Sequence, residues 1–128
     1  MPDAKDLSGR SILVVEDDFY LASDTERALR AAGAEVVGPV PRATLALAAL
    51  AGGDLDAAVV DINLGEGPSF AVAEALKRAG VPFVFVTAQS PSEIPEQYRN
   101  RPVIPKPYYD AALCAALASM LPGTTRRS

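Results

Sequence analysis

Four separate stretches of this chain carry side chains that could act together on a phosphoryl group. Glu16 and Asp17 form an acidic pair, and Asp61 is a single carboxylate at the end of an apolar run. Thr87 and Lys106 follow two further short apolar runs. A carboxylate can act as a nucleophile and form an aspartyl phosphate, while a lysine and a hydroxyl can stabilise the phosphoryl oxygens. Asp61 is therefore the candidate acceptor, and Thr87 and Lys106 are its candidate supports.

The same carboxylates predict a divalent cation. Glu16, Asp17 and Asp61 would repel one another if the fold brought them together, so some would stay protonated without a counter-charge. Mg²⁺ prefers oxygen ligands and commonly takes one or two carboxylates together with phosphate. Asp18 is better read as a helix cap or a solvated residue. The chain contains no histidine, which excludes imidazole as a base, a metal ligand or a phosphocarrier.

Short β-prone runs alternate along the chain with longer helical patterns, and this alternation would position those side chains. Strands are predicted at residues 11–15, 35–38, 57–61, 82–87 and 103–104. Helices are predicted at residues 19–32, 42–51, 70–79 and 109–121, with a short, irregular helix within residues 91–100 because Pro91 and Pro95 interrupt it. The strand at 35–38 is less apolar than the others and is expected near an edge.

Two helices show which face they should bury. In the first, the apolar stripe is Leu21, Thr25, Ala28, Leu29 and Ala32, and Gly33 is a natural residue to end the helix. In the last, the inward positions are Leu113, Leu117, Met120 and Leu121, and the neighbouring Cys114 is expected to be a packed thiol.

Five strands alternating with five helices predict an α/β fold with right-handed crossovers and a doubly wound parallel sheet. The central strands are apolar on both faces, as a sheet covered by helices on both sides requires. In such sheets ligands bind outside the carboxyl ends of the strands. The acidic pair, Asp61, Thr87 and Lys106 all follow strand ends, so we expect them to meet at one edge.

These segments also resemble a known family. VVEDD at residues 14–18, VVDINL at 59–64, VTA at 86–88 and PKP at 105–107 are similar, in order and in spacing, to the four motifs of response-regulator receiver domains. The resemblance covers residues 10–121. It implies a flavodoxin-like (βα)5 sheet with strand order 2-1-3-4-5 and a phospho-accepting role in a two-component system.

The resemblance also implies roles for individual residues. Asp61 would accept a phosphoryl group from a phosphohistidine on a sensor histidine kinase or a histidine phosphotransfer protein. Glu16, Asp17, Asp61 and the backbone carbonyl of Asn63 would hold Mg²⁺. Lys106 would pair with the phosphoryl group, and the peptide bond after it, to Pro107, is expected to be cis. Phosphorylation would switch a protein-interaction surface around the fourth helix and fifth strand, so the chain is expected to be a signalling domain rather than an enzyme.

Two details refine the resemblance. The PFVFVT strand at residues 82–87 is similar to a stand-alone alphaproteobacterial subgroup with a P-F-x-F-x-T-G signature, although Ala88 replaces its glycine. Many receivers carry an aromatic switch residue three positions before the lysine, and here that position is Val103.

Two other functions fit the same fold class. A flavodoxin-like module could hold a nucleotide or a flavin at this edge, but anionic phosphates would then meet carboxylates. No glycine-rich loop follows the first strand, and Gly65-Glu66-Gly67 is read as a turn. An unphosphorylated scaffold is the second alternative, and the chemically competent set of site residues argues against it.

Composition narrows the remaining possibilities. The chain has 128 residues, 49% of them hydrophobic and 22% charged, with a net charge of −4, which predicts one globular domain and no nucleic-acid surface. No stretch resembles a signal peptide or a membrane span, and the single cysteine fits a reducing compartment, so a cytoplasmic location is expected. We expect a receiver domain at 10–122 between flexible segments at 1–9 and 123–128. We also expect a downstream protein partner, no membrane contact and a monomer or weak homodimer.

Overall fold

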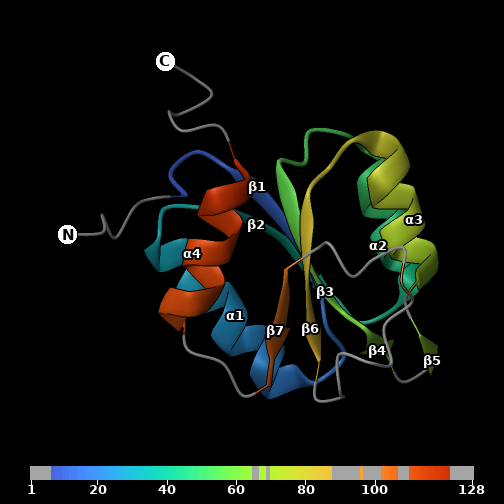
Figure 1. Cartoon of the computed structure of the whole chain (residues 1–128), viewed down its shortest axis with the longest axis horizontal. Coiled ribbons are helices and arrows are strands. Elements are labelled where there is room, and N and C mark those ends of the chain that lie inside the picture. The colour runs from blue at the N-terminus through green and yellow to red at the C-terminus, as the bar shows by residue number, and fades with distance from the viewer. Residues whose placement is uncertain are drawn as a thin grey trace.

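The computed structural model describes residues 7–64, 67–68, 70–87, 96, 102–106 and 110–121. A parallel sheet of five strands lies at its centre (Figure 1). These strands are β1 (Ser11–Val15), β2 (Glu35–Val40), β3 (Ala57–Asp61), β6 (Phe83–Thr87) and β7 (Val103–Pro105). They lie in the order β2-β1-β3-β6-β7. Counted among themselves, this is the predicted order 2-1-3-4-5, which confirms the flavodoxin-like fold class.

The helices cover the two faces of this sheet in pairs (Figure 1). The described helices are α1 (Phe19–Ala31), α2 (Ala43–Ala51), α3 (Phe70–Ala79) and α4 (Asp110–Met120). One core cluster joins the sheet to α2 and α3, and the other joins it to α1 and α4. The three central strands, β1, β3 and β6, are almost entirely buried because both of their faces pack against helices.

The edge strand β2 continues further than predicted. Its register with β1 shifts between Leu13 and Val15, so that Val15 pairs with Val40. Gly38 adopts a φ of 92°, and the Gly38–Pro39 peptide is cis. The irregularity lets the chain remain paired beyond Gly38, where a uniform strand was expected to end. Beyond it, the backbone N–H of Glu16 donates to the carbonyl of Val40, which attaches the end of β2 to the first acidic residue.

Helix α1 begins and ends for identifiable local reasons. Asp18 is its N-cap, and one carboxylate oxygen accepts the backbone N–H groups of Tyr20 and Leu21, which confirms the capping role predicted for Asp18. The chain leaves the helix at Gly33, whose φ of 98° suits a residue without a side chain. One predicted inward residue was wrong: Leu21 is only partly buried, and Ala22 beside it is buried instead, while the rest of the predicted stripe is buried.

Helix α4 packs as its pattern predicted. Leu113 and Leu117 are fully buried, and Met120 and Leu121 pack partly buried against the same cluster. The Cys114 sulfur lies 3.9 Å from the carbonyl oxygen of Ala28, so the thiol rests in the contact between α4 and α1.

The packed chain begins earlier than the predicted boundary at residue 10. Leu7 is fully buried in the core shared with α1 and α4, and its N–H donates to the carbonyl of Ala32. Gly9 donates in the same way to Gly33. Residues 7–9 therefore pack against the domain, which the sequence did not predict, because a single leucine in a polar N-terminus gives no pattern that indicates burial.

A short antiparallel pair was not predicted at all. It joins β4 (Asn63–Leu64) to β5 (Gly67–Pro68), with Leu64 opposite Gly67. The turn predicted at Gly65-Glu66-Gly67 stays a prediction, because residues 65–66 lie outside the described residues and Gly67 belongs to β5. The predicted irregular helix at 91–100, apart from residue 96, and the predicted cis bond before Pro107 also lie outside them. No helix in the described part of the chain is both long and apolar enough to cross a membrane.

Candidate phosphoacceptor site

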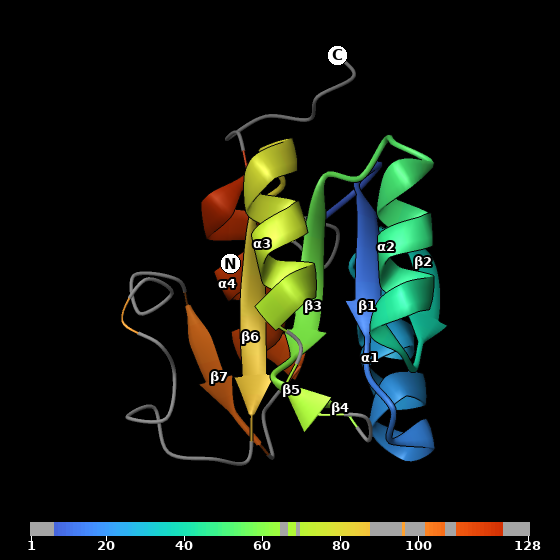
Figure 2. The same ribbon diagram turned by 90° about the vertical axis from the view of Figure 1, so that its right-hand side faces the viewer.

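The carboxyl ends of the parallel strands meet at one edge of the sheet (Figure 2). Val15 pairs with Val60, so the residues that follow them, Glu16 and Asp61, leave neighbouring strands at the same level. On the other side of β3, Asp61 pairs with Val86, which directly precedes Thr87. The parallel register therefore brings together residues that are far apart in the sequence, as predicted.

Lys106 links the two halves of this edge. Its Nζ lies 3.1 Å from Oδ2 of Asp61, to which it donates a hydrogen bond, and 3.0 Å from Oε1 of Glu16. Only 14% of the Lys106 side chain is exposed, and the two carboxylates are almost completely buried. One ammonium group thus partly compensates two buried acids. The pairing of Lys106 with Glu16 was not predicted, because sequence spacing does not show which carboxylate a distant lysine will reach.

A backbone hydrogen bond holds the main chain of Lys106 against the end of β6. The N–H of Lys106 donates to the carbonyl oxygen of Thr87 at 2.8 Å, which extends the pairing of β6 with β7 by one residue. Thr87 is itself buried, with 2% of its surface exposed. Thr87 and Lys106, the predicted hydroxyl donor and the predicted lysine, therefore lie side by side at the ends of adjacent strands, joined by this backbone hydrogen bond.

Three carboxylates are close enough to share a cation. One oxygen from each of Glu16, Asp17 and Asp61 can be chosen so that all three lie within 4.8 Å of one another. Asp17 is exposed, while Glu16 and Asp61 are buried. Asn63, the fourth predicted metal ligand through its carbonyl, lies two residues after Asp61, at the start of β4.

The oxygens of Glu16 show why this edge suits a cation. Oε2 accepts the backbone N–H of Asp18 at 3.1 Å. Oε1 is buried and contacts Lys106, but it accepts no aligned hydrogen bond in the described structure. A buried carboxylate oxygen whose only partner is an ammonium group outside good hydrogen-bond geometry is incompletely satisfied. The three carboxylates offer only oxygen ligands, this oxygen among them, and such a group fits Mg²⁺.

Burial changes the protonation of these groups. Desolvation raises the pKa of Glu16 from 4.5 to about 7, and its hydrogen bond with the Asp61 side chain acts in the same direction. Lys106 and the Asp18 backbone oppose this shift but do not cancel it. For Lys106, desolvation lowers the pKa, but the hydrogen bonds and charges of Glu16 and Asp61 outweigh burial and leave the pKa raised. The lysine therefore stays charged at neutral pH, while Glu16 can hold a proton.

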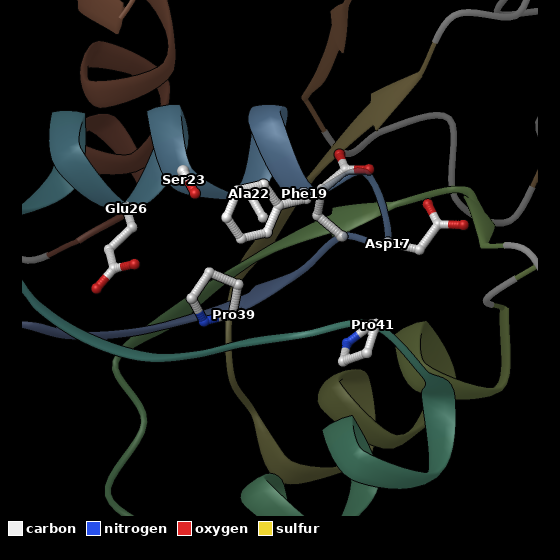
Figure 3. A pocket seen from close by; sticks show the side chains of 8 residues that line it. Asp17, Phe19, Ala22, Ser23, Glu26, Pro39 and Pro41 are labelled. Atoms are coloured by element: carbon white, nitrogen blue, oxygen red, sulfur yellow. The ribbon is translucent and has the colours of Figure 1, made fainter.

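A hollow that was not predicted lies beside this edge. It is lined by Asp17 and by residues of α1 and the end of β2, including Phe19 and Pro39 (Figure 3). Phe19 is 74% exposed, so most of its side chain is open to solvent at the hollow. In the sequence, its only signal was its position directly after the acidic residues.

Solved structures resemble this chain over most of its length, whereas no family profile and no curated protein matches it. The solution structure of SdrG from Sphingomonas melonis Fr1 is 39% identical, with 84% of this chain and 95% of SdrG covered and a TM-score of 0.74. The chain belongs to the response-regulator receiver domains. The beryllofluoride-activated conformation of SdrG, attributed to Pseudomonas melonis Fr1, is 36% identical over 94% of this chain and 100% of that one, with a TM-score of 0.76.

A further match shows this domain within a longer protein. The response regulator PhyR from Brucella abortus is 26% identical, with 87% of this chain but 47% of PhyR covered and a TM-score of 0.75. The receiver-domain family predicted from the four motifs is thus confirmed. Membership of the alphaproteobacterial subgroup stays a prediction, as do the roles assigned to the individual site residues.

Proposed function

We propose that this receiver domain accepts a phosphoryl group on Asp61 from a phosphohistidine of a sensor histidine kinase or a histidine phosphotransfer protein. The observation that supports this best is the position of Lys106, whose ammonium group contacts Asp61 and Glu16 at 3.1 and 3.0 Å. A lysine bonded to an isolated buried aspartate would be an ordinary ion pair. Here a second buried acid and Asp17 adjoin it, which provides an acceptor, a cation-binding group and a fixed positive charge together.

In the proposed transfer, a carboxylate oxygen of Asp61 attacks phosphorus while the bond from phosphorus to the donor histidine nitrogen breaks. The electron pair of that bond returns to the imidazole. The ammonium group of Lys106 stabilises negative charge on the phosphoryl oxygens, and the Thr87 hydroxyl donates to one of them. Bound Mg²⁺, held by Glu16, Asp17, Asp61 and the Asn63 carbonyl, would neutralise further charge.

The product would act as a signal rather than as a released metabolite. The phosphoryl group shifts an equilibrium between two conformations, and a protein partner binds one of them more tightly. The domain is therefore not a conventional enzyme, although it assists its own phosphorylation and dephosphorylation. A cytoplasmic location, a monomer or weak homodimer, and a receiver domain that ends near residue 122 belong to the same proposal.

Intact-mass measurement after incubation with Mg²⁺ and acetyl phosphate tests the acceptor. The wild-type domain should gain one phosphoryl group that is labile to base, and Asp61→Asn should gain none. Asp24→Asn is a matched control, because Asp24 is an exposed carboxylate of α1 that pairs only with Arg27 in the described structure. Phosphate on Asp61→Asn at the wild-type level would refute the assignment.

A further inference from the structure

A pocket of about 260 Å³ lies between the start of α1 and the end of β2 (Figure 3). Its apolar lining comes from Phe19 and Ala22 of α1 and from Pro39 and Pro41. We call it the α1–β2 pocket. Pockets for drug-sized ligands usually exceed about 300 Å³, so this volume suits a single side chain better than a nucleotide.

Every charged side chain that lines the pocket is acidic, although Glu16 also pairs with Lys106 and Glu26 with Arg30, both outside the lining. Besides Glu16, two carboxylates line it, Asp17 and Glu26, and Figure 3 shows them at opposite ends of the hollow. No lysine or arginine is among the described residues that line it. Its electrostatic complement is a cation.

Glu26 retains capacity to bind such a cation. Its ion pair with Arg30 uses one oxygen, Oε2, which lies 2.9 Å from Nε and 2.8 Å from one terminal nitrogen. No hydrogen bond or ion pair to another described residue uses Oε1, and about a third of the side chain is exposed. A second guanidinium group could therefore bind the other oxygen without breaking the existing pair.

Phe19 favours arginine over lysine in this position. Arginine has a planar, weakly hydrated cation that stacks on aromatic rings and can bind a carboxylate with two hydrogen bonds. In Figure 3 the rings of Phe19 and Pro39 lie in the middle of the hollow, between the two acids. A guanidinium group over these rings would have a carboxylate within reach at the Glu26 end.

We propose that the α1–β2 pocket receives an arginine side chain of the protein that docks over the phosphoacceptor edge. The pocket shares Glu16 and Asp17 with that edge. Any protein that delivers a phosphoryl group to Asp61 must therefore approach the mouth of the pocket. The identity of this partner as the phosphodonor rests on the function proposed above, but the preference of the pocket for arginine does not.

NMR titration of the ¹⁵N-labelled domain with N-acetyl-arginine amide, in saturating Mg²⁺, tests the pocket directly. The amide shifts should concentrate at Phe19, Ala22, Glu26 and Val40. N-acetyl-citrulline amide has the same shape without the charge and should bind at least several-fold more weakly. The Glu26→Gln and Phe19→Ala variants should each weaken arginine binding roughly threefold, as expected for a partly exposed ion pair and a cation–π contact.

Two matched controls separate the pocket from general surface effects. Glu74 pairs with Arg78 at the same spacing on α3, so Glu74→Gln removes a comparable helix charge away from the pocket. Leu47 is an exposed apolar residue of α2 that does not line the pocket, so Leu47→Ala should leave binding unchanged. Equal weakening by Glu74→Gln or Leu47→Ala would overturn the proposal.

Two further outcomes would also overturn it. One is equal binding of the citrulline probe, and the other is arginine binding that Mg²⁺ abolishes, which would place the probe in the acidic edge itself. The two proposals can fail separately. If the wild-type domain takes no phosphate but binds arginine, only the function proposed above fails. If it takes phosphate but does not bind arginine, only this inference fails.

Discussion

The protonation of Glu16 is governed by the charged groups around it and by its burial. Lys106 contacts two buried carboxylates with a single positive charge, so the edge carries more negative than positive charge when both acids are ionised. Desolvation and the neighbouring Asp61 then raise the pKa of Glu16 to about 7. Between pH 4.5 and about 7, the metal-free folded domain should therefore keep a proton on Glu16 that the unfolded chain has released.

We predict that the metal-free domain loses stability as the pH rises from about 4.5 to about 7 through this group. In that interval the folded state binds more protons than the unfolded state, so the free energy of unfolding falls with pH. The full contribution is up to about 3 kcal/mol, and it levels off above pH 7. Urea unfolding in EDTA at several pH values measures it.

Glu16→Gln is the control for this pH dependence. Glutamine cannot release the proton, so the wild-type curve should lose stability relative to the variant as the pH rises. Parallel curves for the two proteins would show that Glu16 does not titrate in this way.

The residue types of the site could be predicted from the sequence, but their partners could not. Glu16, Asp17 and Asp61 follow apolar runs, and the end of a strand is readable from hydrophobic pattern. The contact of Lys106 with Glu16 depends on how far the lysine side chain reaches across two strands, and the hydrophobic periodicity of the sequence does not predict this. The α1–β2 pocket depends on the irregular end of β2, which a Gly-Pro sequence does not specify.

At the scale of elements, the connection from α1 to β2 is held by close packing against the N-terminal segment. At Gly33 (φ 98°), an added Cβ would lie 2.9 Å from the Cα of Ser8. Gly53 has a similar φ of 81°, but nothing lies within 4 Å of the same position. Both glycines therefore have a positive φ, but only Gly33 lacks room for a side chain.

We predict that Gly33→Ala destabilises the domain by roughly 1–3 kcal/mol more than Gly53→Ala does. Both variants have the cost of placing a side chain at positive φ, about 1–2 kcal/mol. Only Gly33→Ala must also displace the Ser8 backbone, an overpacking cost of similar size. Chemical denaturation of both variants gives the difference directly. Equal losses of stability in the two variants would mean that residues 7–9 can shift away from the added Cβ at no energetic cost.

The junction of β6 and β7 should carry the phosphorylation signal outward. Val103 of β7 pairs with Phe85. Valine has no aromatic ring that could rotate, and its β-branched side chain is stiff. Attraction of Thr87 to phosphoryl oxygens should instead draw the segment after it. We predict that beryllofluoride changes NMR shifts mainly within residues 88–101 and that Thr87→Ala removes these changes. Changes centred on α1 or α2, and retained in Thr87→Ala, would contradict this route.

Strand and helix positions were the most predictable part of the molecule at this scale. β3 and α3 begin and end where the sequence predicted, because an apolar run and a following glycine define them. The β4–β5 pair was missed, since two-residue strands have too few positions to show alternation. The burial of Leu7 was missed because it depends on tertiary contacts with α1 and α4.

At the scale of the whole molecule, cation binding should be linked to folding. We predict that Mg²⁺ raises the melting temperature, because it binds the assembled acidic edge and not the unfolded chain. At about 100 times its Kd, the gain in unfolding free energy is roughly 2.7 kcal/mol. Asp17→Asn should lose most of this gain, since its carboxylate is one of the three that converge. Differential scanning calorimetry with and without Mg²⁺ provides the comparison.

Asp18→Asn is the matched control for that experiment. Asp18 lies next to Asp17, but its carboxylate caps α1, and asparagine caps a helix about as well. Its melting temperature should therefore rise with Mg²⁺ almost as in the wild type. A wild-type melt unaffected by millimolar Mg²⁺ would argue against the metal site.

The position of Lys106, 45 residues after Asp61 in the chain, also has a consequence for biosynthesis. On the ribosome, Glu16 and Asp61 are translated well before the lysine that compensates them. Burial of two carboxylates without a cation costs several kcal/mol, so a nascent chain that lacks β7 should keep this edge open to water. Residues 102–106 supply the last strand of the sheet and the ammonium group that favours closure of the edge, and they leave the exit tunnel late. Translation pauses before that point would therefore prolong a state in which the acidic edge is hydrated and the sheet is incomplete.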